Sequence, residues 1–216
     1  RAGNSWFCGL QTAVDETAGK GKSVELLQNA EIGAADSTAT GLTITGSVTI
    51  DFNGFLITNV GKKFAVVVSG SSANLILKDS SESQTGGIYG GSGGDNQALR
   101  VESGATVRIE GGAYNVGGDA SGAGHSTVSI ASDSYVTIYG GRFASEKTYM
   151  DKYYVLNVQQ TTGATGEFKV FGGVFVGQNP ADGDDALGGT YIADGYESVE
   201  TKAATETEPA EYTVQL

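Results

Sequence analysis

The sequence predicts an all-β fold: a single-stranded, right-handed parallel β-helix of about five to seven coils with a short N-terminal capping helix. Three observations predict it. Short segments alternate apolar and polar residues, they recur roughly every 30 residues, and a Gly-Gly-x-aromatic sequence occupies one phase of the repeat. One such unit cannot bury its apolar face alone, whereas stacked units can. The alternative, a β-sandwich, would instead carry hairpin turns between its strands.

Residues 1–22 are predicted to cap the stack. Apolar residues at helical spacing indicate a short amphipathic helix over residues 9–18. We expect this helix, together with Trp6 and Phe7, to cover the first coil, because an open strand edge would template aggregation. Cys8 is the only cysteine and is expected to be a small buried apolar residue.

The coils are predicted over residues 23–190, with three short strands in each. One set of alternating triplets lies at residues 42–44, 66–68, 99–101, 128–130 and 156–158. A second set lies at residues 48–50, 75–77, 107–109, 136–138 and 168–170. The third strand is expected to begin at the Gly-Gly-x-aromatic sequences of residues 86–89, 111–114, 140–143 and 172–175, with a looser copy at 53–56. The glycines provide the bend between strands, often with positive φ.

The aromatic residue of each Gly-Gly sequence is expected to point inward and to stack in one internal column. The predicted members are Tyr89, Tyr114, Phe143 and Phe175, with Leu56 below them. The alternative is an aromatic platform for sugars. Repetition at one inward phase favours the core.

The middle residue of each triplet is expected to face solvent, and none of these residues is a carboxylate. They are Thr43, Val67, Arg100, Ser129 and Asn157 in one row, and Thr49, Ile76, Arg108, Thr137 and Lys169 in the other. Val67 and Ile76 are apolar exceptions and are expected to mark a locally covered or adhesive face. Cleavage of polysaccharides needs paired carboxylates or a metal-bound carboxylate cluster. The rows therefore argue against catalysis. Arg100 and Arg108, with Glu102 and Glu110 near them, are expected to form a surface ion-pair patch.

His125 is the only histidine. A Ser-His-Asp site would have to combine it with Asp119 and Ser121 in a glycine-rich loop, which lacks the pre-organisation that catalysis needs. We expect His125 to be an exposed loop residue. One histidine and one cysteine also fall short of an ordinary zinc ligand set.

Ca²⁺ is the only metal ion or cofactor for which the sequence offers candidate binding residues. Asp182, Asp184 and Asp185 crowd one loop and offer the hard oxygen ligands that Ca²⁺ prefers. The alternative is a solvated acidic loop. Residues 90–95 fit a single copy of the glycine-aspartate nonapeptide of Ca²⁺-binding β-rolls, a motif that needs tandem copies.

The C-terminal region, residues 191–216, is expected to close the stack, so that residues 1–216 form a single β-helix domain. Residues 191–192 and 211–216 are predicted to be the closing strands. The acidic stretch 197–208 between them is predicted to be a solvated loop.

The chain carries 13 basic and 25 acidic residues, a formal net charge of −12. Such a surface repels phosphate backbones and anionic lipids, so nucleic acid is not an expected partner. The apolar runs are too short to span a bilayer. A polysaccharide or a host surface protein is the expected partner, bound by loops that leave the rigid stack.

Several segments resemble β-helical domains of bacterial cell-surface proteins. They include the opening at residues 10–15, Ile-Asp-x-Asn-Gly at residues 50–54 and the Val-x-Ile-x-Gly-Gly-x-aromatic coils at residues 107–114 and 136–143. The resemblance implies a pectate-lyase-like fold in a secreted or wall-attached protein, but it does not specify an activity. Residues 1–6 are neither an initiator methionine nor a signal peptide, and we expect a trimmed or mature fragment.

Three functions remain open on the sequence. The favoured one is a non-enzymatic structural or adhesive module of a bacterial secreted or cell-surface protein, presenting loops to a glycan or host protein. The second is a polysaccharide lyase or glycoside hydrolase acting on acidic polysaccharide. The third is a phage or secreted fibre module, which would trimerise, whereas a monomer is expected for the first.

Overall fold

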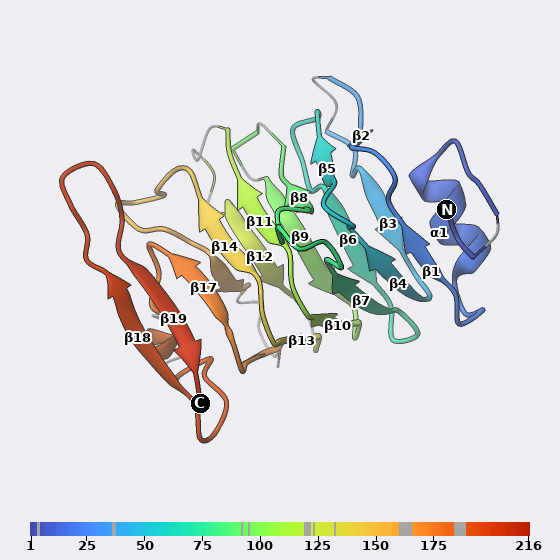
Figure 1. Cartoon of the computed structure of the whole chain (residues 1–216). Helices are drawn as coiled ribbons and strands as arrows, with labels where there is room; N and C mark the ends of the chain where they lie inside the picture. Colours follow the sequence, from blue (N-terminus) through green and yellow to red (C-terminus); the bar gives the residue numbers. More distant parts are fainter. Residues whose placement is uncertain are drawn as a thin grey trace.

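The computed structural model shows a parallel β-solenoid of about five turns with one short helix near the N-terminal end (Figure 1). It describes residues 1–3, 5–35, 38–91, 93–94, 96–118, 122, 124–131, 133–159, 166–183 and 189–216. The chain passes repeatedly through three sheets, and each strand pairs with its equivalent in the next coil. The fold class predicted from the repeat is confirmed.

Each sheet runs along the axis of the stack. Sheet A contains β1 (Ser23–Glu25), β4 (Ser47–Asp51), β7 (Asn74–Lys78), β10 (Thr106–Ile109), β13 (Tyr135–Ile138) and β16 (Glu167–Val170). Sheet B contains β2 (Ala30–Ile32), β5 (Leu56–Asn59), β8 (Gly87–Tyr89), β11 (Ala113–Val116), β14 (Arg142–Ser145), β17 (Gly173–Val176), β19 (Glu211–Gln215) and β18 (Glu197–Lys202). Sheet C contains β3 (Leu42–Ile44), β6 (Val66–Ser69), β9 (Gln97–Glu102), β12 (Ser126–Ile130) and β15 (Leu156–Val158). The helices are α1 (Leu10–Thr17) and a 3₁₀ turn, η1 (Pro180–Asp182).

The alternation in each triplet places its outer residues in the core. Val107 of β10 lies in register with Leu75 of the preceding coil and with Val136 of the next. All three are buried, and the same holds for the outer residues of the other predicted triplets. Side chains that point alternately to the two faces of a strand produce this pattern when one face covers a core.

The second glycine of the Gly-Gly sequence is required by the close approach of successive coils. Gly112, Gly141 and Gly173 all have positive φ, at 96°, 111° and 114°. A Cβ atom at Gly141 would lie 2.9 Å from the carbonyl oxygen of Gly112, and one at Gly173 would lie 3.1 Å from that of Gly141. A larger residue would therefore strain both the backbone and the contact between coils.

The internal aromatic column is confirmed for three of its predicted members. Tyr114 stacks on Phe143 with ring centroids 4.9 Å apart, and Phe143 stacks on Phe175 at 5.0 Å. The prediction is wrong for Tyr89 and Leu56. Their neighbours Ile88 and Ile57 occupy the inward positions, in the sequence Ile57, Ile88, Tyr114, Phe143 and Phe175.

A shift in register by one residue explains why Ile88, and not Tyr89, points inward. Gly87, the second glycine of its pair, lies in register with Ala113 and not with Gly112. The Gly-Gly sequence of this coil is therefore displaced by one residue. Because the side-chain period of a strand is two, a displacement of one residue turns Tyr89 to the outer face. There its hydroxyl donates a hydrogen bond to Glu146 at 2.7 Å.

The outer row of sheet C is partly covered, as expected at the apolar Val67, whereas the prediction that Ser129 faces solvent is wrong. Both are buried, and both lie in register with Arg100 between them. The Arg100 guanidinium lies 4.9 Å from the Phe64 ring and donates a hydrogen bond to Gln159 at 2.8 Å. A side chain that reaches this far along the sheet shields its neighbours from water.

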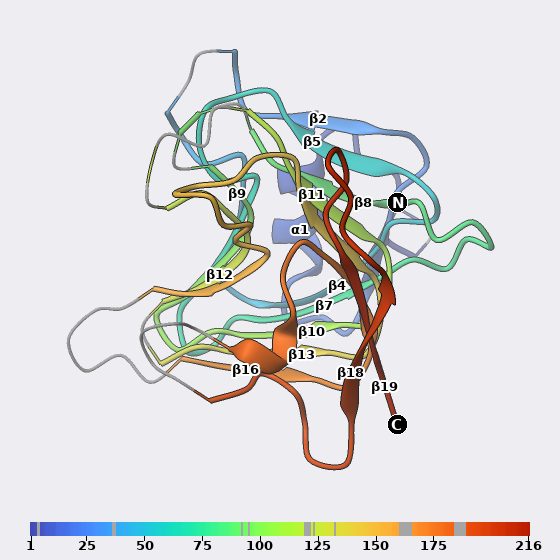
Figure 2. The same ribbon diagram turned by 90° about the vertical axis from the view of Figure 1, so that its left-hand side faces the viewer.

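The C-terminal end closes with an antiparallel hairpin. β19 pairs with β17 and with β18, so residues 197–202 form a strand, and the prediction of a solvated loop is wrong there. The charges of this segment are compatible with its position, because β18 is an exposed edge strand. Residues 191–193 start a further pairing, in which Ala193 N–H donates to Val170 O at 2.9 Å. Figure 2 shows the hairpin at this end.

Candidate functional site

The N-terminal edge of sheet A is covered by the first residues of the chain. Ala2 forms an antiparallel bridge with Val24 of β1. The backbone nitrogen of Glu25 donates to Arg1 O at 2.8 Å, and the backbone nitrogen of Arg1 donates to Glu25 O at 2.7 Å. The Arg1 guanidinium also bonds the Glu25 carboxylate at 2.8 Å. The outward backbone groups of Glu25 are thereby satisfied.

The edges of sheet C are covered by glutamine side chains. Gln11 of α1 donates from Nε2 to Thr43 O at 2.8 Å and accepts at Oε1 from Thr43 N–H at 2.9 Å. At the other end, Gln178 accepts from Leu156 N–H at 2.6 Å and donates to Leu156 O at 3.0 Å. A side-chain amide carries the same donor and acceptor as a peptide group, so each glutamine replaces the missing strand.

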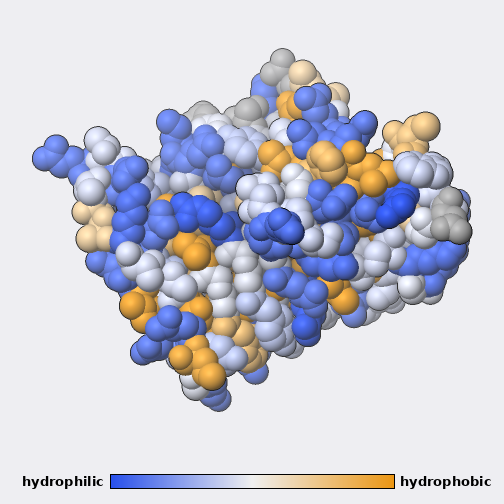
Figure 3. Space-filling view, in the orientation of Figure 1, coloured by the Kyte–Doolittle hydropathy of each residue, from blue (hydrophilic) through white to orange (hydrophobic). Residues whose placement is uncertain are grey.

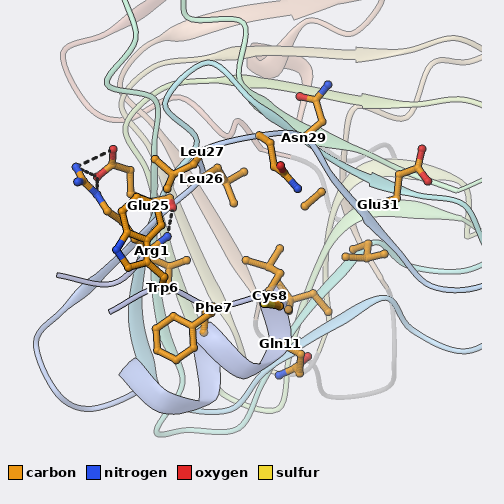
Figure 4. Close-up of a pocket in the computed structure, with 18 of the residues that line it drawn as sticks. Arg1, Trp6, Phe7, Cys8, Gln11, Glu25, Leu26, Leu27, Asn29 and Glu31 are labelled. Atoms are coloured by element: carbon orange, nitrogen blue, oxygen red, sulfur yellow. Dashed lines mark hydrogen bonds and ion pairs between the residues drawn. The ribbon is translucent and has the colours of Figure 1, made fainter. Parts of the chain in front are cut away.

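No described residue pairs with the N-terminal edge of sheet B, which is β2, and a cleft lies there. Its volume is about 600 Å³, and it is enclosed by residues 24–32, the chain before α1 and the first turns of that helix. Figure 4 shows Trp6 and Phe7 beside the helix, with Asn29 and Glu31 across the cleft. A volume of this size is typical of ligand sites.

The walls of the cleft are mainly apolar. Leu26 is buried at its base, and Phe7 and Ile32 are half-buried. Trp6 is 73% exposed and Leu27 is 39% exposed. Figure 3 shows apolar side chains between hydrophilic ones over the N-terminal half of sheet B. Two large apolar side chains beside an apolar cavity make this the most distinctive surface of the described residues.

Two predictions about this end of the chain are corrected. Cys8 is exposed and lines the cleft, so it is not a buried apolar residue. The helix forms as predicted and buries Ala13 and Val14, but Trp6 extends into solvent. The cap is thus complete over sheets A and C and incomplete over sheet B. Contacts between distant residues decide which sheet edges the cap covers, because no local sequence pattern indicates which edge a given residue will cover.

The candidate calcium ligands are only partly described. Asp182 is exposed at the end of η1. Asp184 and Asp185 lie outside the described residues. Residues 90–95 are described apart from Ser92 and Asp95, and Asn96, which follows them, is buried directly before β9. Within the described ranges, no three His, Cys, Asp or Glu side chains are grouped to hold a metal ion.

The prediction that His125 is exposed is wrong. Its side chain is 1% exposed, and its Nε2 lies 3.1 Å from Ser145 Oγ. The Ser145 hydroxyl donates in turn to Lys147 O at 2.8 Å. The His125 ring therefore connects the segment before β12 with the last residue of β14. Asp119 and Ser121 lie outside the described residues.

The two most buried carboxylates of the stack bind backbone groups at the corner between sheets A and B. Asp79 accepts from the N–H groups of Gly54, Ser81 and Gly86 at 2.8, 3.1 and 2.7 Å. Asp51 accepts from Asn53 and Ser80 N–H and lies 3.2 Å from the Lys78 ammonium. These carboxylates hold turns of successive coils together.

Burial by itself would raise the pKa of Asp51. The hydrogen bonds from Ser80, Lys78 and Asn53 outweigh burial and hold the pKa of this carboxyl below its ordinary value of 3.8. On the outer face of sheet B the opposite occurs. Burial, together with the hydrogen bond to Glu146 and its charge, raises the pKa of Tyr89 to about 12.

The predicted arginine patch resolves into two separate ion pairs. Arg100 binds Glu102 at 2.6 Å on sheet C, and Arg108 binds Glu110 at 2.7 Å beside sheet A. The pairs belong to different sheets and do not converge on one site.

An aromatic row lies on the outer surface where sheet A turns into sheet B. Tyr139 stacks on Phe171 at 4.9 Å, and Phe171 meets the ring of Tyr196 edge-to-face at 5.2 Å. The other face of Tyr139 carries the Arg108 guanidinium at 4.2 Å. Both faces of the Tyr139 ring, on which a sugar would stack, are therefore already in contact with protein groups.

Comparisons of the chain with known protein families, with curated proteins and with solved structures found no significant match. In the described ranges, no helix is long and apolar enough to cross a bilayer. The arrangement of the residues therefore carries the functional argument.

The sequence reasoning placed Trp6 and Phe7 in the cap but missed the cleft. One signal was available. Leu26 and Leu27 are adjacent apolar residues at the end of a strand, and alternation allows only one of them to point inward. The second of the two leucines therefore had to be exposed or to be covered by another element of the fold.

Proposed function

We propose that this chain is a non-enzymatic structural and adhesive module of a bacterial secreted or cell-surface protein. Its stack is a rigid support, and its loops bind a glycan or a host surface protein. The stacked core, the buried carboxylate hydrogen bonds and the covered sheet edges support rigidity. The resemblance of the coils to cell-surface β-helices supports the location.

The observation that carries the proposal is the position of the irregular segments. In their described parts, the five connections from sheet B to sheet C contain no helix or strand. These connections are residues 33–41, 60–65, 90–96, 117–125 and 146–155. Figure 2, which looks along the stack, places the described parts of these connections on one side of the coils. Loops that protrude in a row from a rigid scaffold form an extended binding edge.

The hydrogen bonding of the carboxylates supports the non-enzymatic part of the proposal. Asp51 and Asp79 are occupied with backbone groups, and Glu211 binds Arg142 at 3.0 Å through both of its oxygens. Hydrolysis or elimination requires carboxylates that face a substrate. The carboxylates built into the stack serve its structure instead.

Binding to arrays of acidic and neutral glycans and of host surface proteins tests the proposal. Lys147→Glu lies on the loop edge, and Lys169→Glu is a control with the same charge change on the outer face of sheet A. We expect the first variant to weaken binding at least several-fold and the second to leave it unchanged. Equal loss in both variants would show that the loop edge is not the binding surface.

The same preparation should be incubated with pectin, polygalacturonate and alginate, with and without Ca²⁺. We expect neither new reducing ends nor unsaturated products. Turnover that disappears when Asp182, Asp184 and Asp185 are replaced by Asn would establish a lyase or hydrolase and overturn the proposal.

A further inference from the structure

The open edge of sheet B has backbone groups available for a further strand. β2 pairs in parallel with β5, with Ala30 opposite Ile57 and Ile32 opposite Asn59. Ile32 O accepts a hydrogen bond from Val60 N–H at 3.0 Å, so the polar groups of Ile32 are directed at β5. Backbone direction alternates along a strand, so Glu31 between these residues directs its N–H and C=O away from β5. Within the described part of the chain, no hydrogen bond uses either group.

The cleft lies directly along this edge. Residues 28–32 form one of its walls, and Trp6, Phe7 and Leu10 line the opposite side. The corresponding edges of sheets A and C are occupied by Ala2 and Gln11. The cleft is therefore the one position at this end of the described stack where a further strand would continue a sheet.

The two faces of β2 specify alternating chemistry for such a strand. Ala30 and Ile32 are half-buried and lie on the core side, whereas Glu31 between them is exposed. A strand added in register would place its inward side chains in the apolar cleft and its outward side chains beside Glu31. Apolar residues suit the first set. Basic residues suit the second, because the chain carries a net charge of −12.

A second copy of this chain is the alternative occupant, because β18 at the far end of sheet B runs parallel to β2. Its charges oppose this. β18 carries Glu197 and Glu200, which would approach Glu31 of the next copy, and both copies are strongly acidic.

We propose that the N-terminal cleft binds an extended segment of another protein, with alternating apolar and basic side chains, that adds to β2 as a further strand of sheet B. The backbone groups of Glu31 hold the segment, and the apolar walls around Trp6 select its inward side chains. This binding site is separate from the loop edge and does not depend on what that edge binds.

The single tryptophan provides a direct measurement. Trp6 is the only tryptophan in the chain and stands at the mouth of the cleft. The probe is an acetylated and amidated hexapeptide of alternating valine and lysine, titrated into the full chain while Trp6 fluorescence is recorded. We expect a saturable blue shift and slower alkylation of Cys8. No shift at any concentration of the probe would overturn the proposal.

Two control peptides separate strand addition from general association. A probe with the same side chains but N-methylated at every residue loses the N–H donors of both strand edges, and we expect it to bind at least tenfold more weakly. A probe with glutamate in place of lysine should also bind more weakly. Equal binding of the parent and N-methylated peptides would rule out strand addition, and equal binding of the glutamate probe would rule out the charge selection.

Charge reversal in the protein gives an independent test. Glu31→Lys is expected to weaken binding of the lysine probe roughly three- to thirtyfold. Glu82→Lys, an exposed position in the turn after β7, changes the net charge equally and should leave binding unchanged. The same effect in both variants would overturn the assignment to β2. Head-to-tail association of the parent chain in sedimentation experiments, strengthened by Glu31→Lys but not by Glu82→Lys in the absence of peptide, would assign the cleft to a second copy instead.

Discussion

Replacing Asp79 by asparagine tests whether buried carboxylates hold the coils together. Oδ1 of Asp79 accepts from Gly54 and Ser81 N–H, and Oδ2 accepts from Gly86 N–H at 2.7 Å. An asparagine oxygen can retain the first two bonds, but its amide nitrogen then faces the Gly86 N–H as a second donor. One buried N–H loses its acceptor, and two bonds lose the charge that strengthens them. We expect Asp79→Asn to lower the free energy of unfolding by about 2–4 kcal/mol.

The measurement is urea unfolding at neutral pH, followed by circular dichroism and by Trp6 fluorescence. Glu82→Gln removes a carboxylate from the same turn, where it is exposed, and should change the free energy of unfolding by less than about 0.5 kcal/mol. If Asp79→Asn is no more destabilising than this control, the carboxylate bonds are not what joins the coils.

Three further outcomes follow from the structure. Phe143→Ala should destabilise the chain by about 3–5 kcal/mol in thermal or urea unfolding, because its ring is stacked on both faces. Thr137→Ala, on the outer face of sheet A, should destabilise it by less than about 0.5 kcal/mol. Similar losses in the two variants would show that the inward and outward faces are misassigned. Asp51→Asn should lower the free energy of unfolding at neutral pH, and the difference in this free energy from the parent chain should shrink as the pH falls below about 4. The reason is that a carboxyl whose pKa is lowered in the folded state stops stabilising the fold once it is protonated. A difference independent of pH would contradict the role of its charge. Cys8 should react with iodoacetamide in the native chain at a rate comparable with the unfolded chain, and strong protection would indicate that the cleft is closed in solution.

The repeat in the sequence determined the architecture. Alternating triplets and Gly-Gly sequences specify strands and bends locally, because side-chain period and positive φ act within a few residues. The helix Leu10–Thr17 was equally predictable from the helical spacing of its apolar residues. The same local rules fixed Tyr114, Phe143 and Phe175 in the core.

Register was the first property that needed the tertiary structure. The sequence around Gly87 resembles the other coils, yet it is paired one residue out of phase. Only the pairing with the neighbouring coil decides such a register, and the register of β8 directs Tyr89 outward. Similarly, His125 lies in a glycine-rich segment that local rules place in solvent, but its ring is buried against Ser145 from another coil.

The ends of the stack were decided entirely by long-range pairing. Composition disfavours a strand at residues 197–202, but β19 supplies a partner, and an edge position tolerates the charges. Gln11 and Gln178 are unremarkable in the sequence and become strand substitutes only where an edge lies opposite them. The cleft beside β2 exists because, among the residues that the structure describes, none takes that role for sheet B. The sequence by itself thus determined the coils and most of their core, and the tertiary structure decided which strand edges are covered, because covering an edge depends on contacts between residues far apart in the chain.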